Sequence, residues 1–221
     1  MKAFLLAAGQ GKRLYPFTKE LPKPLYKILG KPLIEWNVEK LKEAGYTDLI
    51  INIHHLGNKI IDYLGDGSRF DLKISYSKEK DLLGTGGGIG NALDLLGKEP
   101  FLVLSSDIWT NFNFRNLSLA PGSLGHMVLI PNLNDSIGDV SLHEGIVKST
   151  GKQKKYTFSG IALVHPELFK TIEQTKYHLW ESVLYPASKK NLVTGEIFNG
   201  VLYNINSPED AERLDAFLAQ E

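Results

Sequence analysis

The first half of the chain alternates short apolar runs with amphipathic stretches, and this pattern constrains the fold more than any other feature. Residues 3–7 form an apolar run, and helix-spaced apolar residues follow from 34 to 44, before Gly45. The next apolar run, 49–53, is continuous and rich in β-branched residues. Strand, amphipathic helix and strand in this order form a βαβ unit. The sequence therefore predicts an α/β fold with a Rossmann-like, mostly parallel sheet flanked by helices.

The pattern continues to about residue 110 and then becomes richer in short, alternating strands. We see no linker and no internal repeat, so we predict one domain over residues 1–221 with a smaller, antiparallel lobe in its second half. The further elements predicted are helices at 60–64 and 89–96, strands at 72–76, 101–104, 126–130, 140–142, 146–148 and 156–164, a hairpin turn at His143-Glu144-Gly145, and helices after Pro166 and Pro208.

The charge balance limits the kinds of partner that the chain can bind. It has 25 Lys and Arg against 25 Asp and Glu, and it has no Cys. A zero net charge argues against nucleic-acid or anionic-membrane binding through bulk charge, so any anion must be held by individually placed groups. The lack of Cys excludes disulfides, thiolate metal sites and thiol catalysis. Without a membrane-length apolar run or a full signal sequence, a cytoplasmic protein is expected.

Two motifs near the N-terminus predict an anion site. Leu6-Ala7-Ala8-Gly9-Gln10-Gly11-Lys12-Arg13-Leu14 follows the first strand directly, and its small residues let backbone N–H groups approach anionic oxygens. This segment lacks the ending of a Walker A loop and the third glycine of a dinucleotide fingerprint. Leu21-Pro22-Lys23-Pro24-Leu25 then holds one lysine between two prolines that stiffen the backbone. We interpret Lys23 as a fixed cation.

Both motifs resemble the signature of sugar-1-phosphate nucleotidyltransferases, and five later segments extend the resemblance to about Pro166. Together they look most like N-acetylmuramate-1-phosphate uridylyltransferases. The five segments are Pro32-Leu33-Ile34, Leu64-Gly65-Asp66-Gly67-Ser68-Arg69-Phe70, Leu83-Gly84-Thr85-Gly86-Gly87-Gly88-Ile89, Ser106-Asp107-Ile108-Trp109 and Thr157-Phe158-Ser159-Gly160-Ile161.

The resemblance implies a Mg²⁺-dependent enzyme that joins a sugar 1-phosphate, here N-acetylmuramate 1-phosphate, to UTP, giving a UDP-sugar and pyrophosphate in peptidoglycan recycling. Arg13 would hold the leaving phosphates and Lys23 the α-phosphate, since this chemistry depends on positioning and charge neutralisation. Asp107 would bind Mg²⁺. It also follows a buried strand, where open α/β sheets place their ligands.

The resemblance also assigns the two substrate sites. Residues from about 1 to 110 would bind the nucleotide and those from about 111 to 221 the sugar phosphate, with Gly86-Gly87-Gly88 passing close to the base before a helix starts. Trp109, Tyr156 and Phe158 are candidates for stacking on the sugar. The implied nucleotide-binding residues are Ala7, Ala8, Gly9, Gly11, Glu79, Gly84 and Thr85, and the implied sugar-binding residues are Gly138, Asp139, Ser159 and Gly160.

The chain departs from the family near its C-terminus, where a Trp-x-Asp-x-Gly motif is expected. Here the segment reads Leu202-Tyr203-Asn204-Ile205-Asn206, so the second metal ligand would be Asn204, as in N-acetylglucosamine-1-phosphate uridylyltransferases. Two alternatives stay open: another pair, such as mannose 1-phosphate with GTP, or a weakly active nucleotide-sugar-binding protein. Without the β-helix repeats of trimeric relatives, a monomer or small homo-oligomer is expected. The stretch 151–155 is interpreted as a mobile loop.

Overall fold

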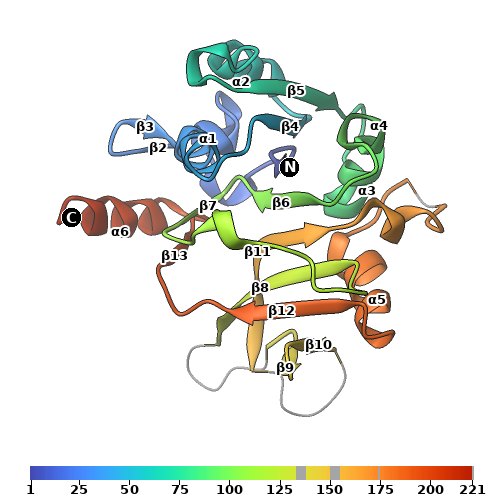
Figure 1. Cartoon of the computed structure of the whole chain (residues 1–221). Helices are drawn as coiled ribbons and strands as arrows, with labels where there is room; N and C mark the ends of the chain where they lie inside the picture. The colour runs from blue at the N-terminus through green and yellow to red at the C-terminus, as the bar shows by residue number, and fades with distance from the viewer. Residues whose placement is uncertain (133–137, 150–154, 174, 221) are drawn as a thin grey trace.

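A nine-stranded mixed sheet forms the centre of the computed structural model, which describes residues 1–132, 138–149, 155–173 and 175–220. Its strand order is β5-β4-β1-β6-β11-β8-β12-β10-β9, and it extends from β5 at one end of the molecule to β9 at the other (Figure 1). The α/β fold predicted from the sequence is confirmed, with its parallel, Rossmann-like part and its smaller antiparallel part. Both parts belong to the same sheet.

The parallel part contains β1 (Lys2–Leu6), β4 (Asp48–Ile53), β5 (Lys73–Lys78) and β6 (Phe101–Ser105). β1 pairs in parallel with both β4 and β6, and β4 pairs in parallel with β5. β1, β4 and β6 are almost continuously apolar because helices cover both faces of the sheet. Their carboxyl ends meet at one edge.

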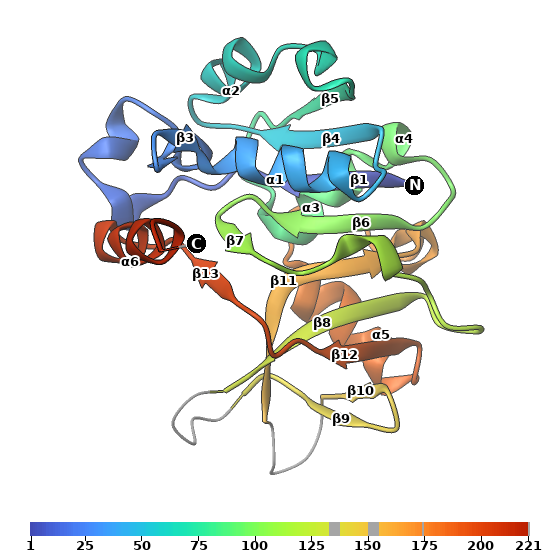
Figure 2. The same ribbon diagram turned by 60° about the vertical axis from the view of Figure 1, so that its left-hand side comes forward.

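Helices cover the two faces of the parallel part in pairs. Successive side chains of a strand point to opposite faces, so Ala3 and Leu5 pack in the core cluster under α1 and α2, whereas Phe4 packs in the cluster with α3. Figure 2 shows α1 lying across β1 and β4. The helices are α1 (Leu33–Glu43), α2 (Gly57–Leu64), α3 (Gly84–Asn91) and α4 (Leu93–Leu96).

The second half of the chain continues the sheet through an antiparallel strand, β11, which pairs with β6 and β8. The register against β8 shifts between Phe158 and Ala162, and Gly160 within this bulge has a φ of +87°. The bulge lies next to the carboxyl end of β6, because Ile161 pairs with Leu104. The strands of this half are β8 (Gly125–Pro131), β9 (Ser141–His143), β10 (Ile146–Lys148), β11 (Tyr156–Val164) and β12 (Val193–Ile197).

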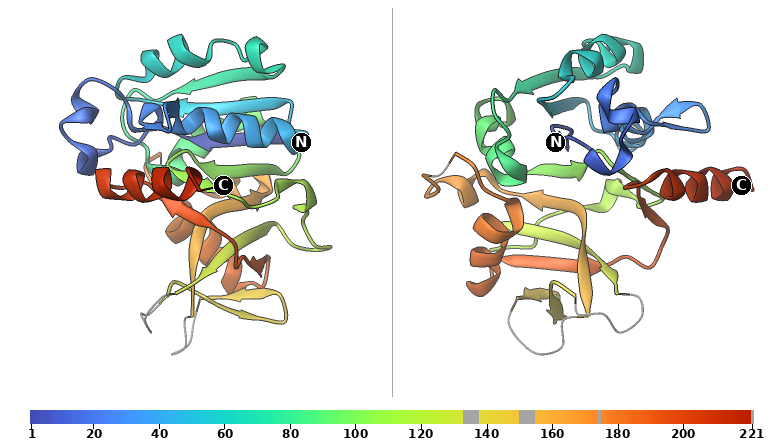
Figure 3. Two further views of the ribbon diagram at one scale, coloured as in Figure 1. Left: turned by 90° about the vertical axis from the view of Figure 1, so that its left-hand side faces the viewer. Right: turned by 180° about the vertical axis from the view of Figure 1, so that it is seen from behind.

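A third core cluster joins the C-terminal helix to the remaining strands. The helix α6 (Pro208–Leu218) packs against Trp109 and Ile28, and it lies beside β13 and away from the large sheet (Figure 3). β7 directly follows Asp107, and β13 pairs antiparallel with it. This pairing holds the segment before α6 near the carboxyl edge of the large sheet. The short strands are β2 (Lys27–Ile28), β3 (Lys31–Pro32), β7 (Ile108–Thr110) and β13 (Leu202–Asn204).

Several predicted elements differ from the structure. The helix predicted at 89–96 begins at Gly84 and is divided into α3 and α4 at Ala92. The helix predicted after Pro166 is a four-residue 3₁₀ turn, Pro166–Phe169. Strands β7, β12 and β13, the π-helical Trp180–Leu184 and α5 (Tyr185–Lys189) were not predicted. Except for Lys155, the loop expected at 151–155 lies outside the described residues. Within the described ranges, no helix combines the length and apolarity that a membrane crossing requires.

Candidate active site

Two adjoining cavities open at the carboxyl ends of β1 and β6. We call them the β1 cavity, of about 420 Å³, and the β11 cavity, of about 350 Å³. They share Leu6, Thr85, Ser105 and His178, so the two cavities lie side by side. The β1 cavity is lined by Leu6, Ala8, Gly9, Gln10, Asn52, Glu79, Leu82, Gly84, Thr85, Ser105, Asp107, Lys176 and His178. The β11 cavity is lined by Leu6, Thr85, Ser105, Ile108, Phe158, Ser159, Gly160, His178, Leu179, Trp180, Glu181 and Asn204.

Two cations and one carboxylate meet beside the β1 cavity. The Lys23 ammonium donates to Asp107 Oδ2 over 2.7 Å and to Asn206 Oδ1 over 3.1 Å. The Arg13 guanidinium donates to the same Asn206 Oδ1 over 2.8 Å. The structure therefore brings together the three residues that the sequence predicts to be catalytic, and adds Asn206, which was not predicted.

The glycine-rich loop fixes the stem of Lys23. Gly11 has a φ of +59°, and a Cβ at this position would lie 2.8 Å from Lys23 Cβ. The hydroxyl of Thr18 donates to the Gly11 carbonyl over 3.2 Å and closes the loop. Lys23 itself begins the 3₁₀ turn Lys23–Leu25 and is only 9% exposed. The paired prolines and the glycine thus hold one ammonium group at the edge of the sheet.

The turn that carries Asp107 is fixed from three sides. Ser106 Oγ donates to the Leu6 carbonyl over 2.6 Å, and Asn37 Nδ2 donates to the Ile108 carbonyl over 3.0 Å. The backbone N–H of Ile205 donates to the Asp107 carbonyl over 2.9 Å. The Asp107 side chain is 32% exposed and lines the β1 cavity. A carboxylate held this way can meet a ligand without rearrangement of the backbone.

Asn204 is the second metal ligand predicted from the sequence. It pairs with Ile108 across β7 and β13, it is exposed, and it lines the β11 cavity. Across the described residues, no group of three or more His, Cys, Asp or Glu side chains gathers that could hold a metal by itself. One carboxylate and one amide oxygen nevertheless fit Mg²⁺, which keeps several waters and takes phosphate oxygens from a substrate.

Glu79 is buried at the floor of the β1 cavity, and a hydrogen-bond chain connects it to the first loop. Its Oε1 accepts from Asn52 Nδ2 over 2.6 Å, and Asn52 Oδ1 accepts from the backbone N–H of Ala7 over 2.7 Å. Its Oε2 accepts from the backbone N–H of Leu83 over 3.1 Å. Each carboxylate oxygen has a second lone pair, so Glu79 can still accept from a ligand.

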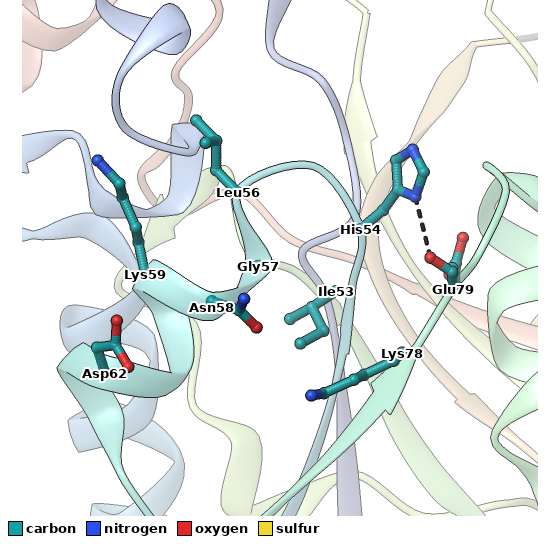
Figure 4. A pocket seen from close by; sticks show the side chains of 9 residues that line it. All are labelled: Ile53, His54, Leu56, Gly57, Asn58, Lys59, Asp62, Lys78 and Glu79. Carbon is teal, nitrogen blue, oxygen red and sulfur yellow. Dashed lines mark hydrogen bonds between the residues drawn. The ribbon is translucent and has the colours of Figure 1, made fainter.

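A further hollow, of about 480 Å³, lies on the other side of Glu79, and Figure 4 shows the side chains that line it. His54 Nδ1 is 3.0 Å from the Glu79 carbonyl oxygen there. Asn52 in β4 and His54 just after the end of β4 thus both contact Glu79. They fix its backbone and its side chain independently.

The glycines after Glu79 differ in position from the prediction. Gly86, Gly87 and Gly88 lie inside α3 and not in a turn before it, and neighbouring segments leave no space for side chains there. A Cβ on Gly86 would lie 2.5 Å from the Tyr177 ring, and one on Gly88 would lie 2.5 Å from Glu79 Oε1. Thr85 Oγ1 accepts from the backbone N–H of Leu179 over 2.9 Å, which ties the helix to the segment that lines both cavities.

The predicted sugar-binding residues separate into two groups. Ser159 and Gly160 line the β11 cavity, whereas Gly138 and Asp139 do not. Asp139 lies one step away, where its Oδ2 accepts from the backbone N–H of Phe158 over 3.3 Å.

The aromatic candidates also separate. Phe158 lines the β11 cavity. Trp109 is instead a core residue with its ring 5.8 Å from that of Phe217, and Tyr156 is not among the residues that line the cavity.

Several lining residues were missed from the sequence. Asn52 is the next-to-last residue of β4, close to the carboxyl edge of the sheet, so its position alone could have marked it as a candidate site residue. Lys176 and His178 lie in an irregular segment and Trp180 and Glu181 in the π-helical turn that follows it. No motif in the sequence places this part of the chain over the cavities.

Comparisons with known proteins place this geometry in context. Residues 2–120 match the family model described as nucleotidyl transferase. An N-acetylmuramate alpha-1-phosphate uridylyltransferase from Neisseria meningitidis is 38% identical over 94% of this chain and 94% of its own length. A mannose-1-phosphate guanyltransferase from Schizosaccharomyces pombe is 30% identical over 95% of this chain, which spans 62% of that relative. The structure of HddC from Yersinia pseudotuberculosis complexed with GMP-PN superposes with a TM-score of 0.79 at 21% identity, covering 98% of this chain and 99% of HddC.

Proposed function

Because this chain belongs to the sugar-1-phosphate nucleotidyltransferase family, we propose that it transfers a uridylyl group from UTP to a sugar 1-phosphate. One observation carries the proposal: Arg13, Lys23 and Asp107 lie together at the carboxyl edge of the sheet, beside two cavities that adjoin. The β1 cavity would take the nucleoside and the β11 cavity the sugar. The phosphates would then meet between them, next to both cations.

The proposed reaction joins two polyanions. A phosphate oxygen of the sugar 1-phosphate attacks the α-phosphorus of the triphosphate, and the bond from that phosphorus to the leaving pyrophosphate breaks. Lys23 neutralises charge that develops on the α-phosphate, and Arg13 holds the departing phosphates. A preorganised charged donor of this kind lowers a barrier by about 3 kcal/mol. Because Lys23 is braced by Gly11 and is largely buried, little reorganisation accompanies its contact with phosphate.

A Mg²⁺ ion fits this proposal as a cofactor held by Asp107 and Asn204. When bound, it would supply further positive charge to the phosphates. One carboxylate oxygen of Asp107 contacts the Lys23 ammonium, so Asp107 could contact Lys23 and a bound Mg²⁺ at the same time.

Uridine is the proposed base. Glu79 offers a buried acceptor at the floor of the β1 cavity, which suits the N3–H of uracil. The name of the Neisseria relative supports the same choice. A carboxylate also accepts from a guanine edge, and the Schizosaccharomyces relative is named for guanylyl transfer, so GTP is the second candidate.

N-acetylmuramate 1-phosphate is the proposed sugar, on the strength of the 38% identity to the Neisseria relative over nearly the whole chain. The proposal places the reaction in the cytoplasm, in the recycling of a peptidoglycan sugar. Mannose 1-phosphate stays the alternative. Phe158 and Trp180 provide the aromatic faces of the β11 cavity on which a sugar ring can pack.

A substrate panel tests the proposal. Purified protein is incubated with Mg²⁺, each of UTP, GTP, dTTP, ATP and CTP, and each of N-acetylmuramate, N-acetylglucosamine, glucose and mannose 1-phosphates, and pyrophosphate release is measured. We expect the highest kcat/KM for UTP with N-acetylmuramate 1-phosphate. A higher kcat/KM for another pair would change the proposed substrates but leave the proposed type of reaction unchanged. No release with any pair, while a UDP-sugar still binds, would favour a binding protein.

The metal assignment has its own test. Replacing Asn204 by Asp adds a carboxylate to a site with one carboxylate, so Asn204→Asp should tighten Mg²⁺ binding, measured by calorimetry and by the Mg²⁺ dependence of the rate. Asn199→Asp adds the same charge at an exposed position that lines neither cavity and serves as the control. An unchanged Mg²⁺ affinity in Asn204→Asp would remove Asn204 from the metal site.

A further inference from the structure

We propose that Asn206 is a positioning residue that holds Arg13 and Lys23 in the arrangement required for the triphosphate. The inference rests on the proposed function. In the motif that this segment resembles, a glycine would stand at position 206. This chain has instead a side chain that contacts both cations.

One oxygen atom makes both contacts. Asn206 Oδ1 accepts from Arg13 over 2.8 Å and from Lys23 over 3.1 Å. This oxygen therefore holds two cations from different segments of the N-terminal region close together, and it lies between their charges as a shared acceptor. Without that acceptor, the exposed Arg13 would be free to move away from Lys23, and the alignment of the two cations for adjacent phosphates would be lost.

The backbone on both sides of Asn206 is fixed. Its own N–H donates to Asp210 Oδ2 over 2.9 Å, and Ser207 forms a capping box with Asp210 at the start of α6. On the other side, Ile205 is fully buried and donates to the Asp107 carbonyl. The amide oxygen is thus aimed at the cations by α6 and by the Asp107 turn. The C-terminal helix in this way sets the geometry of residues near the N-terminus.

The chemistry of the amide suits this role. An amide oxygen accepts hydrogen bonds from both cations without adding a negative charge beside them, so it does not reduce their attraction for phosphate. A carboxylate at the same position would form ion pairs with both and compete with the ligand. Glycine would leave both cations without this partner. Asparagine is therefore the side chain that aligns the two cations while preserving their attraction for an anion.

The test uses the full chain and inorganic pyrophosphate as the probe. Binding of pyrophosphate without divalent metal is measured by calorimetry for the wild type, Asn206→Gly and Asn206→Asp. The KM values for UTP and for the sugar 1-phosphate are measured in parallel. We expect about tenfold weaker pyrophosphate binding in Asn206→Gly, as for loss of a hydrogen bond to a charged group. The loss should be larger in Asn206→Asp, and the KM for UTP should rise more than that for the sugar phosphate.

Asn191→Gly is the matched control. Asn191 also accepts from a lysine, Lys148, over 2.7 Å, and its φ of +58° suits glycine. Pyrophosphate binding in this control should equal that of the wild type. Wild-type affinity in both Asn206 variants, with unchanged melting temperatures, would overturn the positioning role alone. A wild type that binds no pyrophosphate and forms no nucleotide sugar would overturn the proposed function as well.

Discussion

The 2.7 Å ion pair between Lys23 and Asp107 joins residues that are 84 positions apart in the chain. Lys23 is largely buried whereas Asp107 is one-third exposed, so the pair combines a fixed donor with an acceptor that a ligand can reach. In the free protein each side chain stabilises the other. When phosphate arrives, Lys23 can exchange one oxygen partner for another without leaving its place.

Replacing this lysine provides the first prediction. Lys23→Met keeps most of the side-chain volume but removes the ammonium group, and kcat should fall by roughly 100- to 1,000-fold, in line with the loss of a preorganised donor. Lys23→Arg should not restore the rate, because a planar guanidinium does not fit the frame made for a single ammonium. Steady-state kinetics measure both. Lys12→Met, a neighbouring exposed lysine, is the comparison, and a Lys23→Met enzyme with wild-type kcat would contradict the assigned role.

Sequence motifs predict some of the residues at this site and miss others. Arg13, Lys23 and Asp107 were predicted from motifs, because their neighbours carry a recognisable pattern. Asn206 was not predicted, because its contacts depend on the docking of α6 against the N-terminal loop, which no local pattern encodes. Trp180 and Glu181 were missed because their place at the β11 cavity also depends on long-range packing.

Among the elements, α3 shows how glycines form part of the packing. Five of its eight residues are glycine, yet it is helical, since Tyr177, Thr175 and Glu79 occupy the space where side chains would be. The loss of helix propensity that glycine brings is offset by close contact with these neighbours. The helix therefore depends on the segment that covers both cavities.

Gly86→Ala tests this packing. The new Cβ would lie 2.5 Å from the Tyr177 ring, and overpacking of this kind costs about 1–3 kcal/mol. We expect the melting temperature to fall by roughly 2–12 °C, measured by calorimetry. Gly9→Ala, where no atom lies within 4 Å of the added Cβ, is the control for stability. An unchanged melting temperature in Gly86→Ala would show that the segment around Tyr177 yields easily.

The capping box of α6 predicts a pH dependence. Burial acts to raise the pKa of Asp210, but hydrogen bonds from the N–H groups of Asn206 and Ser207 outweigh it and hold the pKa below the ordinary 3.8. A lowered pKa in the folded state means that the carboxylate stabilises the fold above its ordinary pKa, and that this stabilisation is lost as the pH falls through the lower value.

Melting temperatures from about pH 5 to about pH 3 measure this effect. The wild type should lose more stability over this window than Asp210→Asn, whose side chain does not titrate. Glu212→Gln, in the exposed part of the same helix, should behave like the wild type. Equal acid sensitivity of Asp210→Asn and the wild type would contradict the contribution of the cap.

Sequence patterns predict some of the strands and miss others. β1, β4 and β6 were predicted because buried parallel strands are continuously apolar. β12 was missed because its central residues, Thr194, Gly195 and Glu196, carry no apolar pattern, and it forms by pairing with β8 on one side and β10 on the other. The short β7 and β13 likewise exist through their mutual pairing. Elements defined by long-range partners leave little trace in a local sequence.

At the scale of the whole molecule, the continuous sheet places the two cavities side by side. The bulge at Gly160 in β11 lies next to the carboxyl end of β6, and the pairing of β13 with β7 holds the start of α6 near the same edge. Charge is distributed in the same way. The total of 25 cationic and 25 anionic residues is balanced, yet Arg13 and Lys23 both donate to Asn206 Oδ1, so two cations gather locally in a protein of zero net charge. This local positive charge supports the proposed polyanion site.

Isotope labelling tests the proposed nucleotidyl transfer by following the phosphorus atoms of the triphosphate. The protein is incubated with N-acetylmuramate 1-phosphate and UTP that is labelled in one sample at the α-phosphorus and in another at the γ-phosphorus. We predict that the α label appears in the nucleotide sugar and the γ label in pyrophosphate. Appearance of the γ label in the sugar product, or as orthophosphate from the protein's own action, would contradict nucleotidyl transfer.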